Sequence, residues 1–182
     1  MGMKVNHEKQ VAAANDVITA LEAEFSGEGL SCELRMHAGG NQQRSYVYLE
    51  CPPSLWLIVA ETLSEVHGVD YCSMVTGIHW PEKAPEMEWQ VVVHLMRMGI
   101  KNPPSNEGIV MPIISDASIL QGSDMPLEFE VSIPISETRN PSVPSVQHIW
   151  VGADWNEKET WDLVGIDFDG HKEMRRVLQP HE

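Results

Sequence analysis

The chain of 182 residues is long enough for one domain with its own core, and its 42% hydrophobic and 21% charged residues are typical of a globular protein. Its 12 Lys and Arg residues against 27 Asp and Glu residues give a net charge of −15, which repels nucleic acid and anionic lipid. We therefore expect no nucleic-acid partner, and any attachment to a membrane would go through other subunits.

Cysteine usage and hydropathy narrow the class of protein further. The three cysteines, Cys32, Cys51 and Cys72, are far apart and form no C-x-x-C pair, so we expect free thiols in a reducing cytosol and no metal or iron–sulfur cage. No apolar run approaches the ~20 residues that span a bilayer. The N-terminus also lacks the apolar stretch of a secretion signal. The sequence thus predicts a cytoplasmic protein.

The first part of the chain predicts helices that alternate with pairs of strands. Residues 7–25 carry apolar side chains at helical spacing, and residues 52–66 predict a second helix that opens at two prolines and ends at Gly68. Composition or alternation typical of strands marks five segments: residues 31–37, 44–50, 69–80, 89–98 and 129–135. This order predicts an α+β fold in two layers, with two helices on one face of a mixed four- to five-stranded sheet. Pro134 indicates that the last of these strands ends at a sheet edge.

Residues 99–126 are rich in Pro, Ser, Asn, Gly and Asp, which predicts an insertion within a scaffold domain of residues 1–138. Between Lys101 and Arg139 the chain has acidic residues and no Lys or Arg. A solvated loop explains this run most simply, and an acidic adaptor that holds a basic protein is an alternative. Residues 139–182 are predicted to form a separate C-terminal segment.

The C-terminal segment combines aromatic residues, carboxylates and tight turns. Asp154 and Glu157 have the spacing of a capping box, which predicts a helix over residues 155–164 that ends at Gly165. A short extended piece is expected over residues 166–168. One more helical turn over residues 171–177 would place Arg175 and Arg176 at its C-terminal end, where cations are favoured.

Two kinds of chemistry are compatible with these residues. Glu157, Glu159, Asp162, Asp167, Asp169 and His171 contain the oxygen and imidazole groups of a metal site or a general acid–base pair. The spacing nevertheless matches no E-x-x-H, H-E-x-x-H or calcium-loop pattern. In the other interpretation Glu157 caps a helix, and Glu159 and Asp162 pair with Arg175 or Arg176 to fix a rigid recognition surface.

The same segment resembles the C subunit, or 30 kDa subunit, of respiratory complex I and its counterparts in membrane-bound energy-converting [NiFe] hydrogenases. The positions that match the family pattern are Pro144, Ser145, Val146, Ile149, Trp150, Ala153, Trp155, Glu157, Glu159, Asp162, Gly165, Ile166, Phe168, Gly170, His171, Arg175, Arg176, Leu178 and Pro180. Lys158, Trp161, Val164 and Lys172 depart from it, standing where the family has Arg, Tyr, Phe and Pro. These departures favour a hydrogenase-type relative.

The resemblance implies a subunit without a cofactor, a metal or a catalytic residue of its own. Such a subunit lies beside the large catalytic subunit, which holds the quinone site or the nickel–iron centre, and near a ferredoxin-like iron–sulfur subunit. It would be peripheral on the cytoplasmic face of the membrane, as part of an ion-translocating complex. The residues expected to dock on these partners are Trp150, Trp155, Glu157, Glu159, Trp161, Asp162, Phe168, His171, Arg175 and Arg176. The alternative is a standalone metal-dependent enzyme that uses the C-terminal carboxylates and His171.

Overall fold

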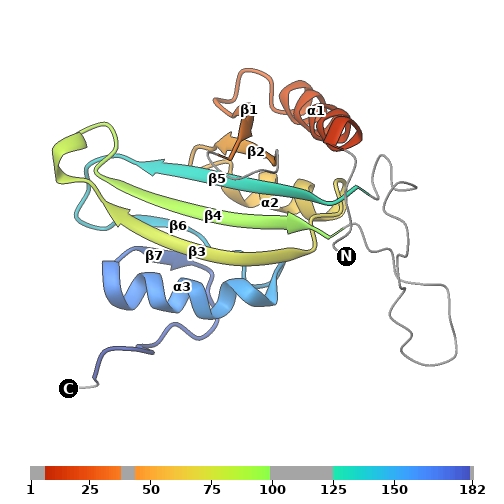
Figure 1. The fold of residues 1–182 in the computed structure, drawn as a ribbon. Helices are drawn as coiled ribbons and strands as arrows, with labels where there is room; N and C mark the ends of the chain where they lie inside the picture. The colour runs from red at the N-terminus through yellow and green to blue at the C-terminus, as the bar shows by residue number, and fades with distance from the viewer. Residues whose placement is uncertain (1–6, 38–43, 99–124, 181–182) are drawn as a thin grey trace, which may run out of the picture.

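The computed structural model describes residues 7–37, 44–98 and 125–180 (Figure 1). Three α-helices and seven β-strands occur in these residues: α1 (His7–Glu24), β1 (Ser31–Met36), β2 (Ser45–Glu50), α2 (Trp56–Glu65), β3 (Tyr71–His79), β4 (Trp89–Arg97), β5 (Leu127–Ile135), β6 (Ser142–Pro144), α3 (Val151–Val164) and β7 (Asp167–Asp169). A short 3₁₀ helix at Pro81–Lys83 lies between β3 and β4. The predicted α+β class and the mixed sheet are confirmed.

Five strands form one sheet in the order β1-β2-β5-β4-β3, with β2 and β5 parallel and every other pair antiparallel. The ladder between β2 and β5 ends where Glu50 faces Ser132, whereas β5 continues to pair with β4 through Pro134 and Ile135. Pro134 therefore has a partner strand on one side only, and proline, which has no N–H to donate, is tolerated at such a position. The prediction that β5 ends at an edge is confirmed in this limited sense.

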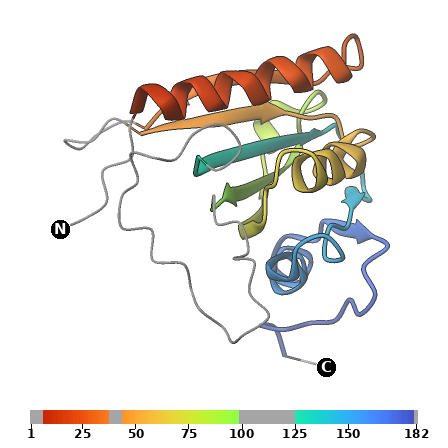
Figure 2. The same ribbon diagram turned by 90° about the vertical axis from the view of Figure 1, so that its right-hand side faces the viewer.

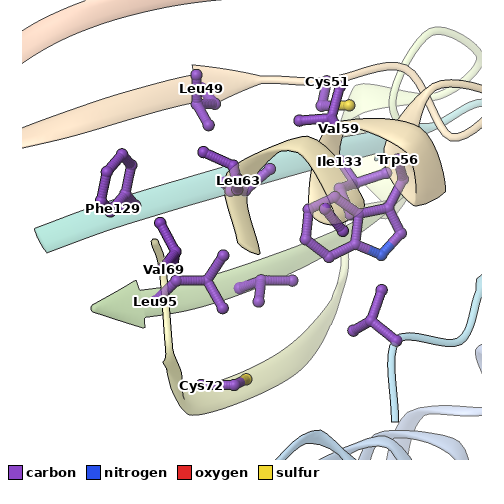
Figure 3. Close-up of a cluster of buried hydrophobic side chains, with 14 of the residues drawn as sticks. Leu49, Cys51, Trp56, Val59, Leu63, Val69, Cys72, Leu95, Phe129 and Ile133 are labelled. Atoms are coloured by element: carbon purple, nitrogen blue, oxygen red, sulfur yellow. The ribbon is translucent and has the colours of Figure 1, made fainter. Parts of the chain in front are cut away.

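The core lies on one face of the sheet, where alternate side chains of the central strands point (Figure 3). Leu49 of β2, Phe129 of β5 and Leu95 of β4 pack there against Trp56 and Leu63 of α2, and all five are at most 1% exposed. Alternation with period two places the intervening residues of β4 and β5 on the opposite face, where most are partly exposed. This is the pattern of a sheet that is covered by helices on one side.

All three helices lie on this one face, with α1 along the β1–β2 side, α2 over the middle and α3 against β3 (Figure 2). The Thr62 hydroxyl of α2 donates to Glu24 of α1 at 3.4 Å, and Gly77 of β3 meets the Thr160 and Ile166 side chains. The helix of the C-terminal segment, α3, therefore lies on the same face of the sheet as the two predicted helices, α1 and α2. The predicted insertion at residues 99–126 lies almost entirely outside the described residues, and the domain boundary at residue 138 stays a prediction.

Candidate functional site

The C-terminal segment is attached to the sheet through α3, and Trp150 fixes the start of that helix. The Trp150 side chain is buried, its Nε1–H donates to the Val69 carbonyl at 2.9 Å, and its ring centroid lies 6.4 Å from that of Trp56. Further along α3, the Thr160 hydroxyl donates to the Val75 carbonyl of β3 at 3.2 Å. Trp150 is thus a core residue that positions α3, and it presents no surface to a partner.

The helix and β3 approach each other closely at Gly152. A Cβ atom at Gly152 would lie 2.4 Å from the Cys72 carbonyl oxygen, which is far inside van der Waals contact. Glycine is required here because two backbones meet with no space for a side chain. Local patterns could not predict this contact, because Cys72 and Gly152 are 80 positions apart in the chain.

A second, two-stranded sheet holds the chain that follows α3. The strands β6 and β7 are parallel, with Val143 opposite Phe168, and both of these side chains are buried. Gly165 ends α3 in the left-handed conformation at φ 87°, as predicted, and so allows the chain to turn back toward β6. Phe168 is therefore a second core support rather than an exposed anchor.

Glu157 does not cap α3, and the predicted capping box is wrong. The helix begins at Val151 after Trp150, which makes no side-chain capping bond, so Asp154 and Glu157 both lie inside the helix. Glu157 is fully buried and accepts hydrogen bonds from the Ser145 hydroxyl at 2.6 Å and the Val146 N–H at 2.8 Å. Burial raises the pKa of Glu157 to about 7, although these two hydrogen bonds oppose the shift and the charge of Asp154 adds to it.

Asp154 joins Glu157 to two further groups. Both oxygens of Asp154 accept from the buried Lys158 ammonium, at 3.0 and 2.9 Å, four residues further along the helix. The His171 side chain is 1% exposed, and its Nε2 lies 3.2 Å from Asp154 Oδ1 and 3.9 Å from Glu157 Oε2. We call Asp154, Glu157, Lys158, His171 and Ser145 the buried polar cluster.

Asp162 holds the last described residues in place. Its Oδ2 accepts the backbone N–H groups of Val177, Leu178 and Gln179 at 3.1, 2.9 and 2.8 Å. Partial desolvation would raise the pKa of Asp162, but these three donors and the charge of Arg176 together lower it. The predicted helical turn over residues 171–177 is wrong, because the backbone there is irregular and the amides of residues 177–179 bond to Asp162.

The expected ion pairs between the arginines and the carboxylates are also absent from the residues that the structure describes. Arg175 and Arg176 are exposed and lie within 4.0 Å of neither Glu159 nor Asp162. Glu159 instead accepts from the Nε1–H of Trp155 at 2.7 Å, one helical turn away. Both arginines therefore keep donors that are directed to solvent.

The ten predicted site residues fall into two groups. Trp150, Glu157, Phe168 and the His171 side chain are buried, and Trp161 is half-buried against the core. Trp155, Arg175 and Arg176 are exposed, and the half-buried Glu159 and Asp162 lie next to them. The first group builds the segment, and the second is available to a partner.

Sequence reasoning missed two apolar residues on the outer side of α3. Val151 is 91% exposed and Leu163 is 56% exposed, and they lie four residues before and eight after the half-exposed Trp155. Spacings of four and eight residues place the three side chains along one side of the helix. Helical spacing from Trp155 could have indicated this stripe. We call Val151, Trp155, Leu163, Arg175 and Arg176 the outer surface of the segment.

The described residues give little support to a cysteine nucleophile or to a metal site. Burial raises the pKa of each thiol, Cys32, Cys51 and Cys72, to about 12, so none is poised as a nucleophile. Within residues 7–37, 44–98 and 125–180, no group of three His, Cys, Asp or Glu side chains is arranged to hold a metal ion. In the same residues, no helix is sufficiently long and apolar to cross a membrane.

The fold and the C-terminal segment define a two-layer α+β protein that exposes apolar and basic side chains on and after its last helix. Comparison of the sequence with known families gives the particular group. The profile described as "Respiratory-chain NADH dehydrogenase, 30 Kd subunit" matches residues 49–182. The chain belongs to this family, and the match begins well before the C-terminal pattern, at β2.

Relatives with similar sequences carry names that agree with this family. The chain is 29% identical over 135 residues to "NAD(P)H-quinone oxidoreductase subunit J, chloroplastic" from Illicium oligandrum, covering 70% of this chain and 82% of that one. It is 30% identical over 130 residues to "NAD(P)H-quinone oxidoreductase subunit J" from Synechococcus sp. (strain WH7803), covering 71% of this chain and 60% of that one.

Two solved structures share the fold. "Nqo5 of the trypsin-resistant fragment (1-134)" aligns with a TM-score of 0.56 and 18% identity over 88% of this chain and 98% of that one. A chain of "the membrane-bound sulfane sulfur reductase (MBS), an archaeal respiratory membrane complex" aligns with a TM-score of 0.53 and 15% identity over 88% of this chain and 72% of that one. At these identities the likeness concerns the fold alone.

Proposed function

We propose that this protein is a cofactor-free scaffold subunit of a membrane-bound oxidoreductase complex, in which it docks beside the large catalytic subunit and a ferredoxin-like iron–sulfur subunit. The outer surface of the C-terminal segment makes the contact. Membership of the 30 kDa subunit family supports the assignment to such a complex. A position on the cytoplasmic face is part of the proposal, with attachment through the other subunits because the net charge of −15 repels anionic lipid.

One observation supports the non-catalytic part of the proposal: two carboxylates of the segment, Glu157 and Asp162, already accept hydrogen bonds within the chain. Glu157 accepts from Ser145 and Val146, whereas Asp162 accepts from three backbone amides. Carboxylates that are saturated in this way fix local structure, and a metal ion or substrate would have to displace those donors.

Two features of the outer surface favour a protein partner. Trp and Arg are the residues most enriched among those that dominate binding energy at interfaces. Trp155, Leu163 and the two arginines are exposed, and the Nε1–H of Trp155 donates to Glu159, which limits the rotation of the indole ring. A ring that is held in place loses less conformational freedom when a partner covers it.

The partner surface should combine an apolar depression with carboxylates. Trp155 and Leu163 supply the apolar contacts, and Arg175 and Arg176 supply guanidinium groups that match carboxylates in bidentate geometry. Their positive charge stands out in a chain of net charge −15 and would attract acidic groups on a partner.

Affinity purification from detergent-solubilised membranes tests this proposal, with the tagged chain expressed in place of the native one. We expect the large catalytic and iron–sulfur subunits to copurify with the wild type and to be lost with Trp155→Ala or with Arg175→Ala combined with Arg176→Ala. Arg44→Ala, a change of an exposed arginine at the start of β2, is the matched control and should leave the yield unchanged. Recovery of the wild-type chain alone would refute the proposal.

Metal analysis of the purified chain separates the scaffold from the metal-dependent enzyme. A scaffold retains its unfolding temperature after treatment with a chelator and carries metal far below one equivalent. A stoichiometric metal that is lost together with stability would favour the enzyme.

A further inference from the structure

Glu157 lies in an unusual environment for a carboxylate. It is fully buried in the middle of α3, and no cation is bonded to it, because the nearby Lys158 ammonium is engaged by both oxygens of Asp154. The groups that touch Glu157 directly are the Ser145 hydroxyl and the Val146 N–H. A buried carboxylate normally has a charged partner, so the environment favours the neutral form of the acid.

His171 covers Glu157 without supplying a charge. The Nδ1 atom of His171 accepts the Glu173 N–H at 3.2 Å, so the proton of the ring is on Nε2, which faces Asp154. Protonation of Nδ1 would direct two N–H groups at each other. In this arrangement Nε2 lies 3.9 Å from Glu157 Oε2, beyond hydrogen-bond distance.

The charges of the cluster can be counted from every element that packs around Glu157. The helix α3 contributes Asp154 and Lys158, which cancel, and the segment after β7 contributes His171, whose Nδ1 accepts the Glu173 N–H. The strand β3 contributes Cys72, whose buried thiol is neutral. Ionised Glu157 would leave one uncompensated negative charge away from water, and one added proton removes it.

We propose that Glu157 and His171 form a proton-binding latch: a proton on Glu157 keeps His171 and the segment after β7 closed on α3, and loss of that proton favours opening. Protonated Glu157 donates to the Ser145 oxygen 2.6 Å away. Ionised Glu157 gains most from contact with water, which reaches it once His171 leaves. Burial raises the pKa of Glu157 to about 7, in the direction that this geometry requires.

The segment after β7 is the part of the cover that can move most easily. The residues that follow His171 are mostly exposed up to Pro180, so releasing them uncovers little apolar surface (Figure 1). The other cover, at Ser145 and Val146, is held between β6 and the buried Trp150. Opening at His171 therefore breaks fewer buried contacts than opening at Ser145.

The latch regulates the proposed docking surface, because Arg175 and Arg176 belong to the segment that it holds. This consequence rests on the proposed function, whereas the binding of the proton does not and is measured on the isolated chain. If the protein assembles with no partner, the latch can still be present. If the latch is absent, docking through Trp155 is unaffected.

Amide hydrogen exchange of the isolated full-length chain at pH 6 and pH 8, corrected for intrinsic exchange rates, tests the latch. The reporters are the Glu173 N–H, bonded to His171, and the His171 N–H, bonded to the Phe168 carbonyl at 3.1 Å. A carboxyl group that titrates near 7 when closed and near its ordinary value when open makes opening about tenfold more favourable at pH 8. Glu157→Gln mimics the neutral acid and should remove this dependence.

The matched control is Glu159→Gln, the same change two residues further along α3 on a partly exposed side chain. In this variant the segment after β7 should open to the same extent as in the wild type at both pH values. Equal opening of the wild type at pH 6 and pH 8, or a pH dependence that persists in Glu157→Gln, would overturn the latch. If Glu157→Gln does not fold, a ¹³C titration of the Glu157 carboxyl in the wild type decides: a midpoint near 7 supports the latch, and a midpoint near 4.5 overturns it.

Discussion

Replacement of Gly152 by alanine tests whether α3 is fixed on the sheet as described. The added Cβ would lie 2.4 Å from the Cys72 carbonyl oxygen, a backbone atom that cannot rotate away. The helix cannot shift to make room without weakening the bonds from Trp150 to Val69 and from Thr160 to Val75.

The expected cost follows from these contacts. Forcing a methyl group into a packed site costs about 1–3 kcal/mol, and a strained hydrogen bond adds up to roughly 1 kcal/mol. The higher helix propensity of alanine returns up to about 1 kcal/mol. We expect a net loss of about 2 kcal/mol in the free energy of unfolding, which lowers Tm by roughly 4–8 °C for a chain of this size.

Urea and thermal unfolding of the isolated chain measure this change, with Gly77→Ala as the matched control. The Cβ of that variant would meet Thr160 Cγ2 at 2.7 Å and Ile166 Cδ1 at 2.8 Å, which are ends of side chains and can adjust. Gly152→Ala should therefore be the less stable of the two. Wild-type stability of Gly152→Ala, or a larger loss in Gly77→Ala, would refute the placement of α3 against β3.

Three further changes probe other contacts of the C-terminal segment. The pKa of Glu157 is raised to about 7 in the folded chain from an ordinary 4.5, so the unfolding free energy should fall by up to about 3 kcal/mol as pH rises between these values. Urea unfolding at pH 5 and pH 8 measures this fall, which should be smaller for Glu157→Gln than for the wild type. Trp150→Phe removes the donor to Val69 and should lower the unfolding free energy by about 1–2 kcal/mol, whereas unchanged stability would contradict the core role of Trp150. Asp162→Ala should speed amide exchange at residues 177–179 with α3 unchanged, and unaltered exchange there would count against Asp162 as their acceptor.

The helices and strands were predictable because the spacing of apolar side chains among neighbouring residues indicates the type of secondary structure. Apolar spacing located α1 and α2, and period-two alternation located β1 and β2 to within one residue at each end. Gly165 was predicted as the end of α3, since the left-handed conformation there favours glycine. These are local rules, and here tertiary contacts did not override them.

The roles of the charged residues in the segment were not predictable by local rules. Asp154 and Glu157 have the spacing of a capping box, but α3 starts earlier, after Trp150, whose indole donates to the Val69 carbonyl, and Glu157 is buried inside the helix. The partner of Glu157 is Ser145, twelve positions away across a turn. Trp150 and Trp155 illustrate the same limit, since two tryptophans five positions apart are 3% and 50% exposed.

The family resemblance is confirmed, but it could not separate buried supporting residues from surface residues in the C-terminal segment. All ten residues expected to dock were given one role, whereas burial divides them into a group that includes Trp150 and Phe168 and a group that includes Trp155 and Arg175. The exposed side chains of α3 also include Val151 and Leu163, which fall outside the set of expected docking residues. Tertiary packing decides which side chains of the helix are exposed, and local sequence patterns do not indicate it.

The central claim is that the outer surface of the C-terminal segment docks this chain within an oxidoreductase complex. Mass-spectrometric quantification of the subunits that copurify with tagged wild-type and Trp155→Ala chains tests it most directly. We expect the large catalytic and iron–sulfur subunits to copurify in stoichiometric amounts with the wild type. The amounts of both should fall severalfold with Trp155→Ala, while the variant remains folded. Equal recovery of both subunits with the two chains would contradict it.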